Sequence, residues 1–207
     1  MVARWAHNPK VVSSNLTPAT RRSRYNSGFI IFTVAMEPQA LPAKNHKAGF
    51  VCIAGKPNVG KSTLMNALTG MKLSIVTPKA QTTRHRIRGI INGENFQVVF
   101  SDTPGIIKPH YLLHERMMDN VRAAFADADI VLLVTDLDED YNNEELTNVF
   151  RQLKTPVIVA INKADVSVED EIKKLVSGWK KKLNPRAVIP ISAKENFNIE
   201  ELKQMLI

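Results

Sequence analysis

The segment Gly55-Lys-Pro-Asn-Val-Gly-Lys-Ser62 has the pattern G-x-x-x-x-G-K-S between an apolar run, Phe50–Ala54, and residues 62–68 with helical spacing. This order of strand, loop and helix lets successive backbone N–H groups and a helix N-terminus face one anion. The alternative, an ordinary glycine-rich turn with an exposed lysine, does not require such flanks. The motif therefore predicts a loop that grips a triphosphate, with Lys61 near the β and γ phosphates and the Ser62 hydroxyl on Mg²⁺.

From Ala48 onward, short apolar runs alternate with segments of helical periodicity, which predicts an α/β fold. Asn92-Gly93 favours a tight hairpin, and one strand pair is then antiparallel. We expect a six-stranded, mostly parallel sheet with helices on both faces. The expected strands are Phe50–Ala54, Ile87–Ile91, Gln97–Ser101, Ile130–Thr135, Val157–Ile161 and Val188–Ile191, and the expected helices are Lys61–Thr69, Leu112–Ala126, Asn143–Leu153, Val168–Leu183 and Ile199–Leu206.

A second polar loop, Asp102-Thr-Pro-Gly105, follows the expected strand that ends at Ser101. The carboxyl ends of parallel strands meet at one edge of a sheet, where α/β proteins bind ligands. We expect Asp102 to hold Mg²⁺ through water and the Gly105 N–H to reach the γ-phosphate, so that the loop responds to hydrolysis. A plain turn would explain this tetrapeptide by itself, and its position after the lysine motif favours the phosphate role.

A third loop, Asn162-Lys-Ala-Asp165, indicates which base is attached to the phosphates. The Asp165 carboxylate can accept two hydrogen bonds from N1–H and the exocyclic amine of guanine, and adenine offers no such pair. Asn162 is expected to brace the neighbouring loops, Lys163 to lie along the base, and Ala193 of Ser192-Ala-Lys194 to offer its N–H to guanine O6. A helix-capping turn is the alternative. Together, the loops predict GTP as the ligand.

In this order the motifs resemble the translation-factor-related GTPases. Lys79-Ala-Gln-Thr-Thr-Arg-His-Arg-Ile87 narrows the resemblance to the Era GTPase family, over about residues 47–207. It implies a P-loop NTPase with a Ras-like G domain, Mg²⁺ as cofactor, and Lys61, Thr83 and Gly105 as catalytic residues. Thr83 would complete the Mg²⁺ shell in the GTP state, with Thr82 as the alternative. The implied Mg²⁺ ligands are Ser62, Thr83 and Asp102, and the predicted GTP-binding residues are Gly55, Lys56, Pro57, Asn58, Val59, Gly60, Lys61, Ser62, Thr63, Asp102, Thr103, Pro104, Gly105, Ile106, Asn162, Lys163, Ala164, Asp165, Ser192, Ala193 and Lys194.

Ile106 stands where Ras-like GTPases carry a glutamine that orients the attacking water. An isoleucine cannot polarise water, so we expect slow intrinsic hydrolysis. In several relatives within the resembled group, a K⁺ ion is held by the asparagine that corresponds to Asn58. The resemblance therefore implies a K⁺ site there.

The net charge of +8 is concentrated at the N-terminus, because residues 1–47 hold seven basic residues and one acidic residue, against 21 and 19 in the rest. We interpret residues 1–47 as a disordered leader or a misassigned start, with Met36 as the alternative start, and residues 48–207 as the G domain. Residues 1–36, which lack Asp and Glu, also resemble an organellar transit peptide.

The apolar runs of the sequence are too short to span a bilayer. Cys52, the single cysteine, is expected to fill the core.

The expected function is a GTP-hydrolysing switch, and the resemblance implies a role in assembly of the 30S subunit and maturation of 16S rRNA. Ribosomal RNA would be held mainly by a KH domain after residue 207, in a cytoplasmic protein with peripheral membrane association and no DNA partner. Two alternatives are a GTPase of tRNA modification or large-subunit assembly, and a guanine-nucleotide sensor without enzymatic activity. Basic residues at Arg84–Arg88 and along 173–182 could contact RNA, but a solvated surface explains them more simply.

Overall fold

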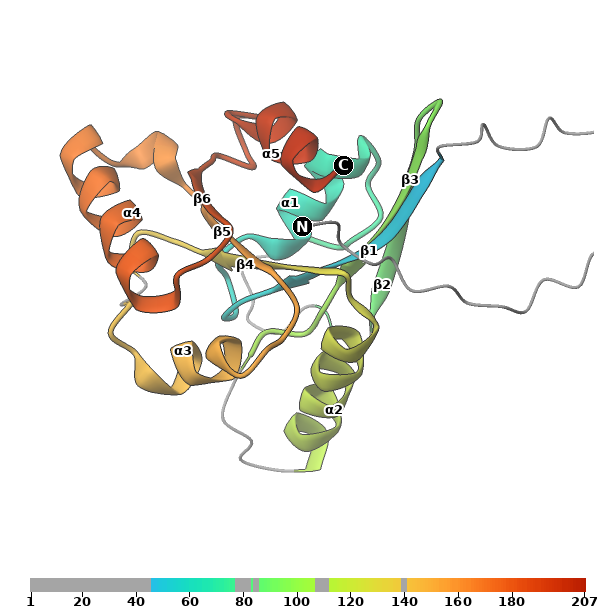
Figure 1. The fold of residues 1–207 in the computed structure, drawn as a ribbon, viewed down its shortest axis with the longest axis horizontal. Helices are drawn as coiled ribbons and strands as arrows, with labels where there is room; N and C mark the ends of the chain where they lie inside the picture. The colour runs from blue at the N-terminus through green and yellow to red at the C-terminus, as the bar shows by residue number, and fades with distance from the viewer. Residues whose placement is uncertain (1–45, 77–82, 84–85, 107–111, 139–140) are drawn as a thin grey trace, which may run out of the picture. The chain divides into compact units, whose positions relative to one another are not determined.

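The computed structural model describes residues 46–76, 83, 86–106, 112–138 and 141–207 (Figure 1). Six strands form one sheet in the order β2-β3-β1-β4-β5-β6. The pair β2–β3 is antiparallel and the other four pairs are parallel, as the sequence predicts. The strands are β1 (Lys47–Ala54), β2 (Ile87–Asn92), β3 (Phe96–Asp102), β4 (Ile130–Thr135), β5 (Val157–Ile161) and β6 (Ala187–Pro190).

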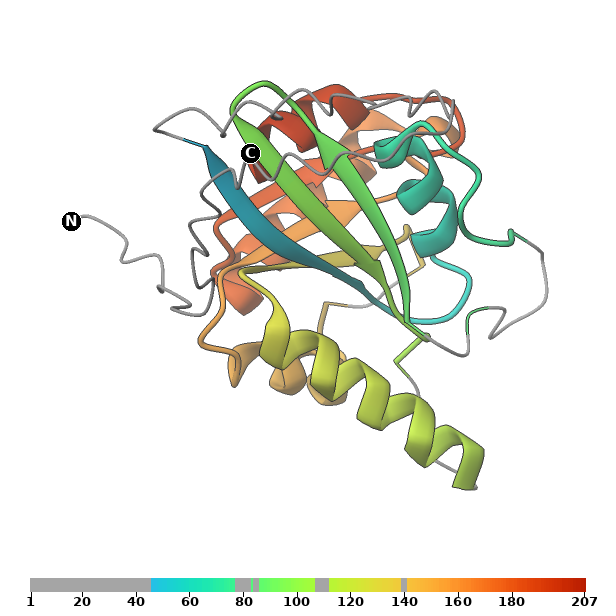
Figure 2. The same ribbon diagram turned by 90° about the vertical axis from the view of Figure 1, so that its right-hand side faces the viewer.

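Helices cover both faces of the sheet, and each face has its own apolar cluster (Figures 1 and 2). Alternate residues of β1 divide between the clusters, with Val51 and Ile53 in one and Cys52 and Ala54 in the other. The helices α1 and α5 pack on the first face, and α2, α3 and α4 pack on the second. Their bounds are α1 (Lys61–Thr69), α2 (Leu112–Asp127), α3 (Glu144–Arg151), α4 (Glu169–Leu183) and α5 (Ile199–Leu206), and a short 3-10 helix, η1 (Ala164–Val166), follows β5.

Some boundaries differ from the expected ones for identifiable reasons. Strand β1 begins at Lys47 rather than Phe50, because Lys47 pairs with Phe96 although it is exposed and gives no apolar signal. Helix α3 begins at Glu144, since Asn143 is its N-cap and the side chain accepts the Leu146 N–H at 3.2 Å. The first 45 residues of the expected leader lie outside the described ones, and the domain boundary at residue 48 stays a prediction.

The hairpin between β2 and β3 is present, but its turn lies further along the chain than predicted. Asn92 still pairs with Gln97, and the Gly93 N–H donates to the Phe96 carbonyl at 2.8 Å. The turn therefore falls at residues 94–95, and Gly93 does not adopt a positive φ. The Asn-Gly signal indicates the correct hairpin but the wrong register.

Two side chains in the apolar cluster of the second face, one aromatic and one thiol, are fully buried. Trp179 of α4 is fully buried and meets the Tyr141 ring edge to face at a centroid distance of 6.4 Å. Cys52 is also fully buried, and burial raises the pKa of its thiol to about 12, so it is the core residue predicted from the sequence. In the part of the chain that the structure describes, no helix is long and apolar enough to cross a membrane.

We predict that Trp179→Ala lowers the free energy of unfolding by about 3–5 kcal/mol, because it removes a large buried ring and leaves a cavity. Urea unfolding followed by circular dichroism measures this loss. Lys180→Ala, on the exposed side of the same helix, is the control and should change stability by less than about 0.5 kcal/mol. Equal losses in the two variants would contradict the packing described here.

Candidate nucleotide-binding site

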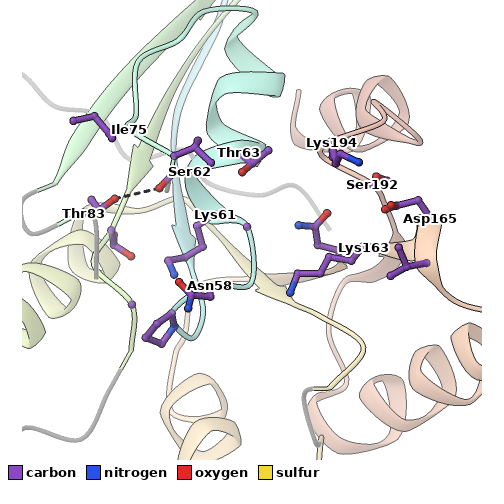
Figure 3. Close-up of a pocket in the computed structure, with 17 residues that line it drawn as sticks. Asn58, Lys61, Ser62, Thr63, Ile75, Thr83, Lys163, Asp165, Ser192 and Lys194 are labelled. Atoms are coloured by element: carbon purple, nitrogen blue, oxygen red, sulfur yellow. Dashed lines mark hydrogen bonds between the residues drawn. The ribbon is translucent and has the colours of Figure 1, made fainter. Parts of the chain in front are cut away.

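The loops that follow β1, β3, β5 and β6 meet around one cavity of about 540 Å³. These four strands are parallel, so their carboxyl ends lie at the same edge of the sheet. Figure 3 shows Ser62 and Thr83 together on one side of the cavity, with Asp165, Ser192 and Lys194 on the other. The lining contains residues from every motif of the sequence analysis: Pro57, Asn58, Gly60, Lys61, Ser62, Thr63, Thr83, Thr103, Gly105, Asn162, Lys163, Asp165, Ser192 and Lys194.

Gly55 and Gly60 of the first motif must be glycines, because neighbouring protein atoms leave no room for a Cβ. A Cβ on Gly55 would lie 2.1 Å from the Val134 carbonyl oxygen of β4, and one on Gly60 would lie 2.2 Å from the Asn162 amide nitrogen. Gly55 and Gly60 also have φ values of 150° and 97°, and Asn58 between them has φ 65°. The loop is therefore shaped by close contacts with β4 and with the third motif, before any phosphate is present.

Lys61 is buried at the start of α1, and its ammonium donates to the Lys56 carbonyl at 2.6 Å. Burial lowers the pKa of this lysine to about 8, while the negative charge of Asp102 opposes the shift. An ammonium group in such a place lacks full solvation. Bound phosphate oxygens would supply the negative charge that the site lacks.

Three hydroxyl groups converge on one oxygen of the buried Asp102 carboxylate. Ser62, Ser74 and Thr83 donate to Oδ2 at 2.8, 3.0 and 3.3 Å, and the Ser62 and Thr83 hydroxyls are 3.1 Å apart. The second oxygen, Oδ1, is buried and has no hydrogen-bond partner among the residues that the structure describes. Burial raises the pKa of Asp102, and the Ser62 hydrogen bond opposes this shift.

This set of oxygen atoms fits a Mg²⁺ ion, which prefers oxygen ligands and retains several waters. The unpartnered Oδ1 of Asp102 leaves an acceptor for a metal-bound water. Ser62, Thr83 and Asp102 are the ligands that the sequence predicts, and the structure brings all three together. Thr82, the alternative to Thr83, lies outside the described residues.

Asn162 joins the loop of the first motif to the loop after β6. Its amide donates to the Val59 carbonyl at 2.8 Å, and its Oδ1 accepts the Ala193 N–H at 2.9 Å. The bracing role predicted for Asn162 is thus present. The Ala193 N–H, predicted to meet guanine O6, is already used inside the protein, so contact with O6 would require it to be shared or released.

Asp165 is exposed on the cavity side of η1, where its carboxylate can meet a ligand. The Ser192 hydroxyl holds the pKa of Asp165 below its usual value, so the group is ionised at neutral pH. Lys163 lines the cavity, and its ammonium pairs with Asp136 at 2.6 Å. Asp136 follows β4 and belongs to no motif recognised in the sequence.

The loop after β3 packs tightly against the first motif. A Cβ on Gly105 would lie 2.8 Å from Pro57, and the Ile106 N–H donates to the Gly55 carbonyl at 3.0 Å. The Thr103 hydroxyl donates to the Ile53 carbonyl at 2.8 Å. Ile106 packs against the apolar cluster of the second face and offers no polar group to a water molecule.

Sequence reasoning missed several residues of the site, because each is a single residue outside a recognisable motif. Ser74 reaches Asp102, and Asp136 reaches Lys163, only through the tertiary fold. The others are exposed apolar side chains at the edge of the cavity: Ile75, Val76 and Val166.

Arg86, one of the basic residues considered for RNA contact, is engaged within the protein. Its guanidinium donates to the Ser101 hydroxyl and pairs with Asp127, the last residue of α2, at 2.5 Å. Arg88 is exposed, and Arg84 and His85 lie outside the described residues. The lysines of α4 lie on its solvent side, as the simpler interpretation predicts: Lys173, Lys174, Lys180 and Lys181 are exposed and Lys182 is half-buried.

Comparisons with known proteins show GTPase relatives over most of this chain. The sequence profile of the family described as 50S ribosome-binding GTPase matches residues 50–163. GTPase Era of Clostridium beijerinckii is 40% identical over 162 residues, which are 77% of this chain and 54% of that protein. The chloroplastic GTPase ERA1 of Zea mays is 42% identical over 175 residues, which are 79% of this chain and 40% of that protein.

A solved structure of Era in complex with MgGDPNP and nucleotides 1506–1542 of 16S ribosomal RNA shares the fold. It is 37% identical with a TM-score of 0.72 and covers 78% of this chain and 56% of that chain. The fold and the site thus define a P-loop GTPase domain. The chain belongs to the family described as 50S ribosome-binding GTPase, and its resemblance to Era is confirmed. It spans about half the length of the first curated relatives that it matches.

The lowered pKa of Lys61 predicts how the stability of the ligand-free protein depends on pH. The unfolded lysine keeps its proton up to about 10.5, whereas the folded one loses it at about 8. At this lysine the unfolded state binds more protons in this window, so Lys61 contributes a rise of up to about 3 kcal/mol in the free energy of unfolding, which the raised pKa of Cys52 opposes above about pH 9.

Lys61→Met should remove this rise and should be more stable than the native chain at pH 7. Denaturant unfolding at several pH values between 7 and 10.5 measures the difference. Lys72→Met, at an exposed lysine, is the control and should keep the native pH profile. Parallel profiles for the native chain and Lys61→Met would contradict the predicted pKa.

Proposed function

We propose that residues 48–207 bind GTP together with Mg²⁺ and hydrolyse it to GDP and phosphate. One observation carries this proposal: a buried cation, Lys61, and an exposed carboxylate, Asp165, line opposite parts of a single cavity. The first would bind the phosphates and the second would bind guanine. The relatives named GTPase Era support the same assignment.

Each residue of the cavity has a distinct task in this proposal. Lys61 and the backbone N–H groups of residues 55–61 would neutralise charge on the β and γ phosphates, and the Gly105 N–H would contact the γ-phosphate. Mg²⁺, held by Ser62, Thr83 and the water-linked Asp102, would supply further neutralisation of the phosphate oxygens. With Ile106 unable to orient water, the intrinsic rate would be slow.

A K⁺ ion beside Asn58 is the proposed source of further charge neutralisation. Asn58 is exposed at the cavity and held with φ 65°. We predict that single-turnover hydrolysis in Mg²⁺ is faster in K⁺ than in Na⁺ and that Asn58→Ala removes the difference. Equal rates in the two salts would contradict the K⁺ site. GTP binding without any turnover would instead favour the alternative of a sensor without enzymatic activity.

Asp165→Asn tests the base assignment. The amide cannot accept both hydrogen bonds from guanine, but it can accept from N1–H and donate to the 2-oxo group of xanthine. We predict that GTP binding weakens by about 100-fold or more and that xanthosine triphosphate binds the variant more tightly than GTP does.

Calorimetry with GTP, ATP and xanthosine triphosphate measures this change. Asp170→Asn, at an exposed carboxylate in the first turn of α4, should keep the native preference. A native chain that binds ATP as well as GTP would overturn the whole assignment.

We further propose a role in ribosome assembly, with 16S rRNA and the 30S subunit as partners. The solved structure of Era with nucleotides 1506–1542 of 16S ribosomal RNA supports this for a relative. The description of the matched family, 50S ribosome-binding GTPase, favours the large subunit as the second candidate. Co-sedimentation of the GTP-bound chain with separated 30S and 50S subunits would discriminate between them.

Three expectations from the sequence stay predictions. The RNA-binding KH domain expected after residue 207 rests on family resemblance. Peripheral membrane association of a cytoplasmic protein rests on family resemblance. Organellar targeting concerns residues 1–36, which lie outside the described ones.

A further inference from the structure

In the segment between α1 and Thr83, a polar side chain is buried while its apolar neighbours are exposed. Ser74 is only 1% exposed, whereas the apolar side chains of Leu73 and Ile75 beside it are 37% and 69% exposed. Burial of apolar surface would favour the opposite arrangement. Hydrogen bonds rather than the hydrophobic effect must therefore hold Ser74 in its buried position.

Asn66, in the second turn of α1, provides most of these hydrogen bonds. Its Oδ1 accepts the N–H groups of Leu73 and Ser74, each at 2.9 Å, and its amide donates to the Ser74 carbonyl at 2.9 Å. One side chain thus satisfies both backbone groups of Ser74. This fixes the serine against the same helix that begins at the phosphate-binding loop.

The Ser74 hydroxyl completes the connection by donating to Asp102 Oδ2 at 3.0 Å. Ser62 donates to the same oxygen at 2.8 Å from the start of α1. Ser62 and Thr83 are proposed metal ligands, whereas Ser74 is not and would remain bonded to Asp102 when the ion is present. Its hydrogen bond would then orient the carboxylate.

We propose that Ser74 and Asn66 are positioning residues of the Mg²⁺ site: Asn66 fixes Ser74, and the Ser74 hydroxyl orients Asp102 toward the ion. This inference rests on the proposed function, since it presumes a guanine nucleotide bound with Mg²⁺. Hydrogen-bond partners of metal ligands typically contribute 10- to 100-fold in metal affinity. Loss of the Ser74 hydroxyl should therefore weaken Mg²⁺ binding without altering contacts to the base.

The test is equilibrium binding of fluorescent GDP to the full chain in excess Mg²⁺ and in excess EDTA. In the native chain, Mg²⁺ should tighten GDP binding. In Ser74→Ala, the Mg²⁺ concentration that gives half of this effect should rise about 10- to 100-fold, while the affinity in EDTA should stay unchanged.

Asn66→Ala should show the same shift, and the double variant should not exceed the larger single effect, because Asn66 acts through Ser74. Thr147→Ala is the matched control: it removes a fully buried hydroxyl in α3 and should keep the native Mg²⁺ response. Thermal unfolding shows whether each variant is folded. If Asn66→Ala does not fold, Ser74→Ala alone decides.

Two outcomes overturn the inference while leaving the proposed function intact. One is a native Mg²⁺ response in folded Ser74→Ala. The other is an equal loss of GDP affinity in Mg²⁺ and in EDTA, which would indicate a structural role. A native chain that binds no guanine nucleotide in either condition would overturn the proposed function itself, and this inference with it.

Discussion

The buried carboxylate of Asp102 is the group around which the start of α1 and the segment before β2 are arranged. It lies at the carboxyl end of β3, out of contact with solvent, and accepts hydrogen bonds from Ser62, Ser74 and Thr83. These donors come from three separate segments. A buried charge requires such partners, because its desolvation would otherwise be costly. The hydrogen bonds to this one carboxylate therefore hold the start of α1, Ser74 and Thr83 at the same point.

Asn162 has the corresponding role between the two ends of the cavity. Its amide donates to the carbonyl of Val59 and its oxygen accepts the N–H of Ala193, so the loops that follow β1, β5 and β6 share one side chain. The close approach of Asn162 to Gly60 is also why that glycine cannot carry a Cβ. The phosphate and base loops are thus held in a fixed relation, which a nucleotide of given length requires.

Contiguous motifs were predicted well, and for a physical reason. A phosphate-binding loop needs a strand before it and a helix after it, and Gly55–Ser62 carries both requirements in neighbouring residues. The same holds for the buried runs that became β4 and β5, whose apolar residues match the predicted bounds. The exposed start of β1 and the register of the β2–β3 turn were not predicted, because pairing with β3 determines them and leaves no apolar signal in the sequence.

The strands, the helices and the place of each motif at a strand end follow from residues that are neighbours along the chain. Which single residues meet depends instead on how those elements pack: Ser74 with Asp102, Lys163 with Asp136, and Arg86 with Asp127. Each of these contacts joins residues at least 27 positions apart. An isolated serine or aspartate carries no pattern, so its partner follows from the packing of strands and helices alone.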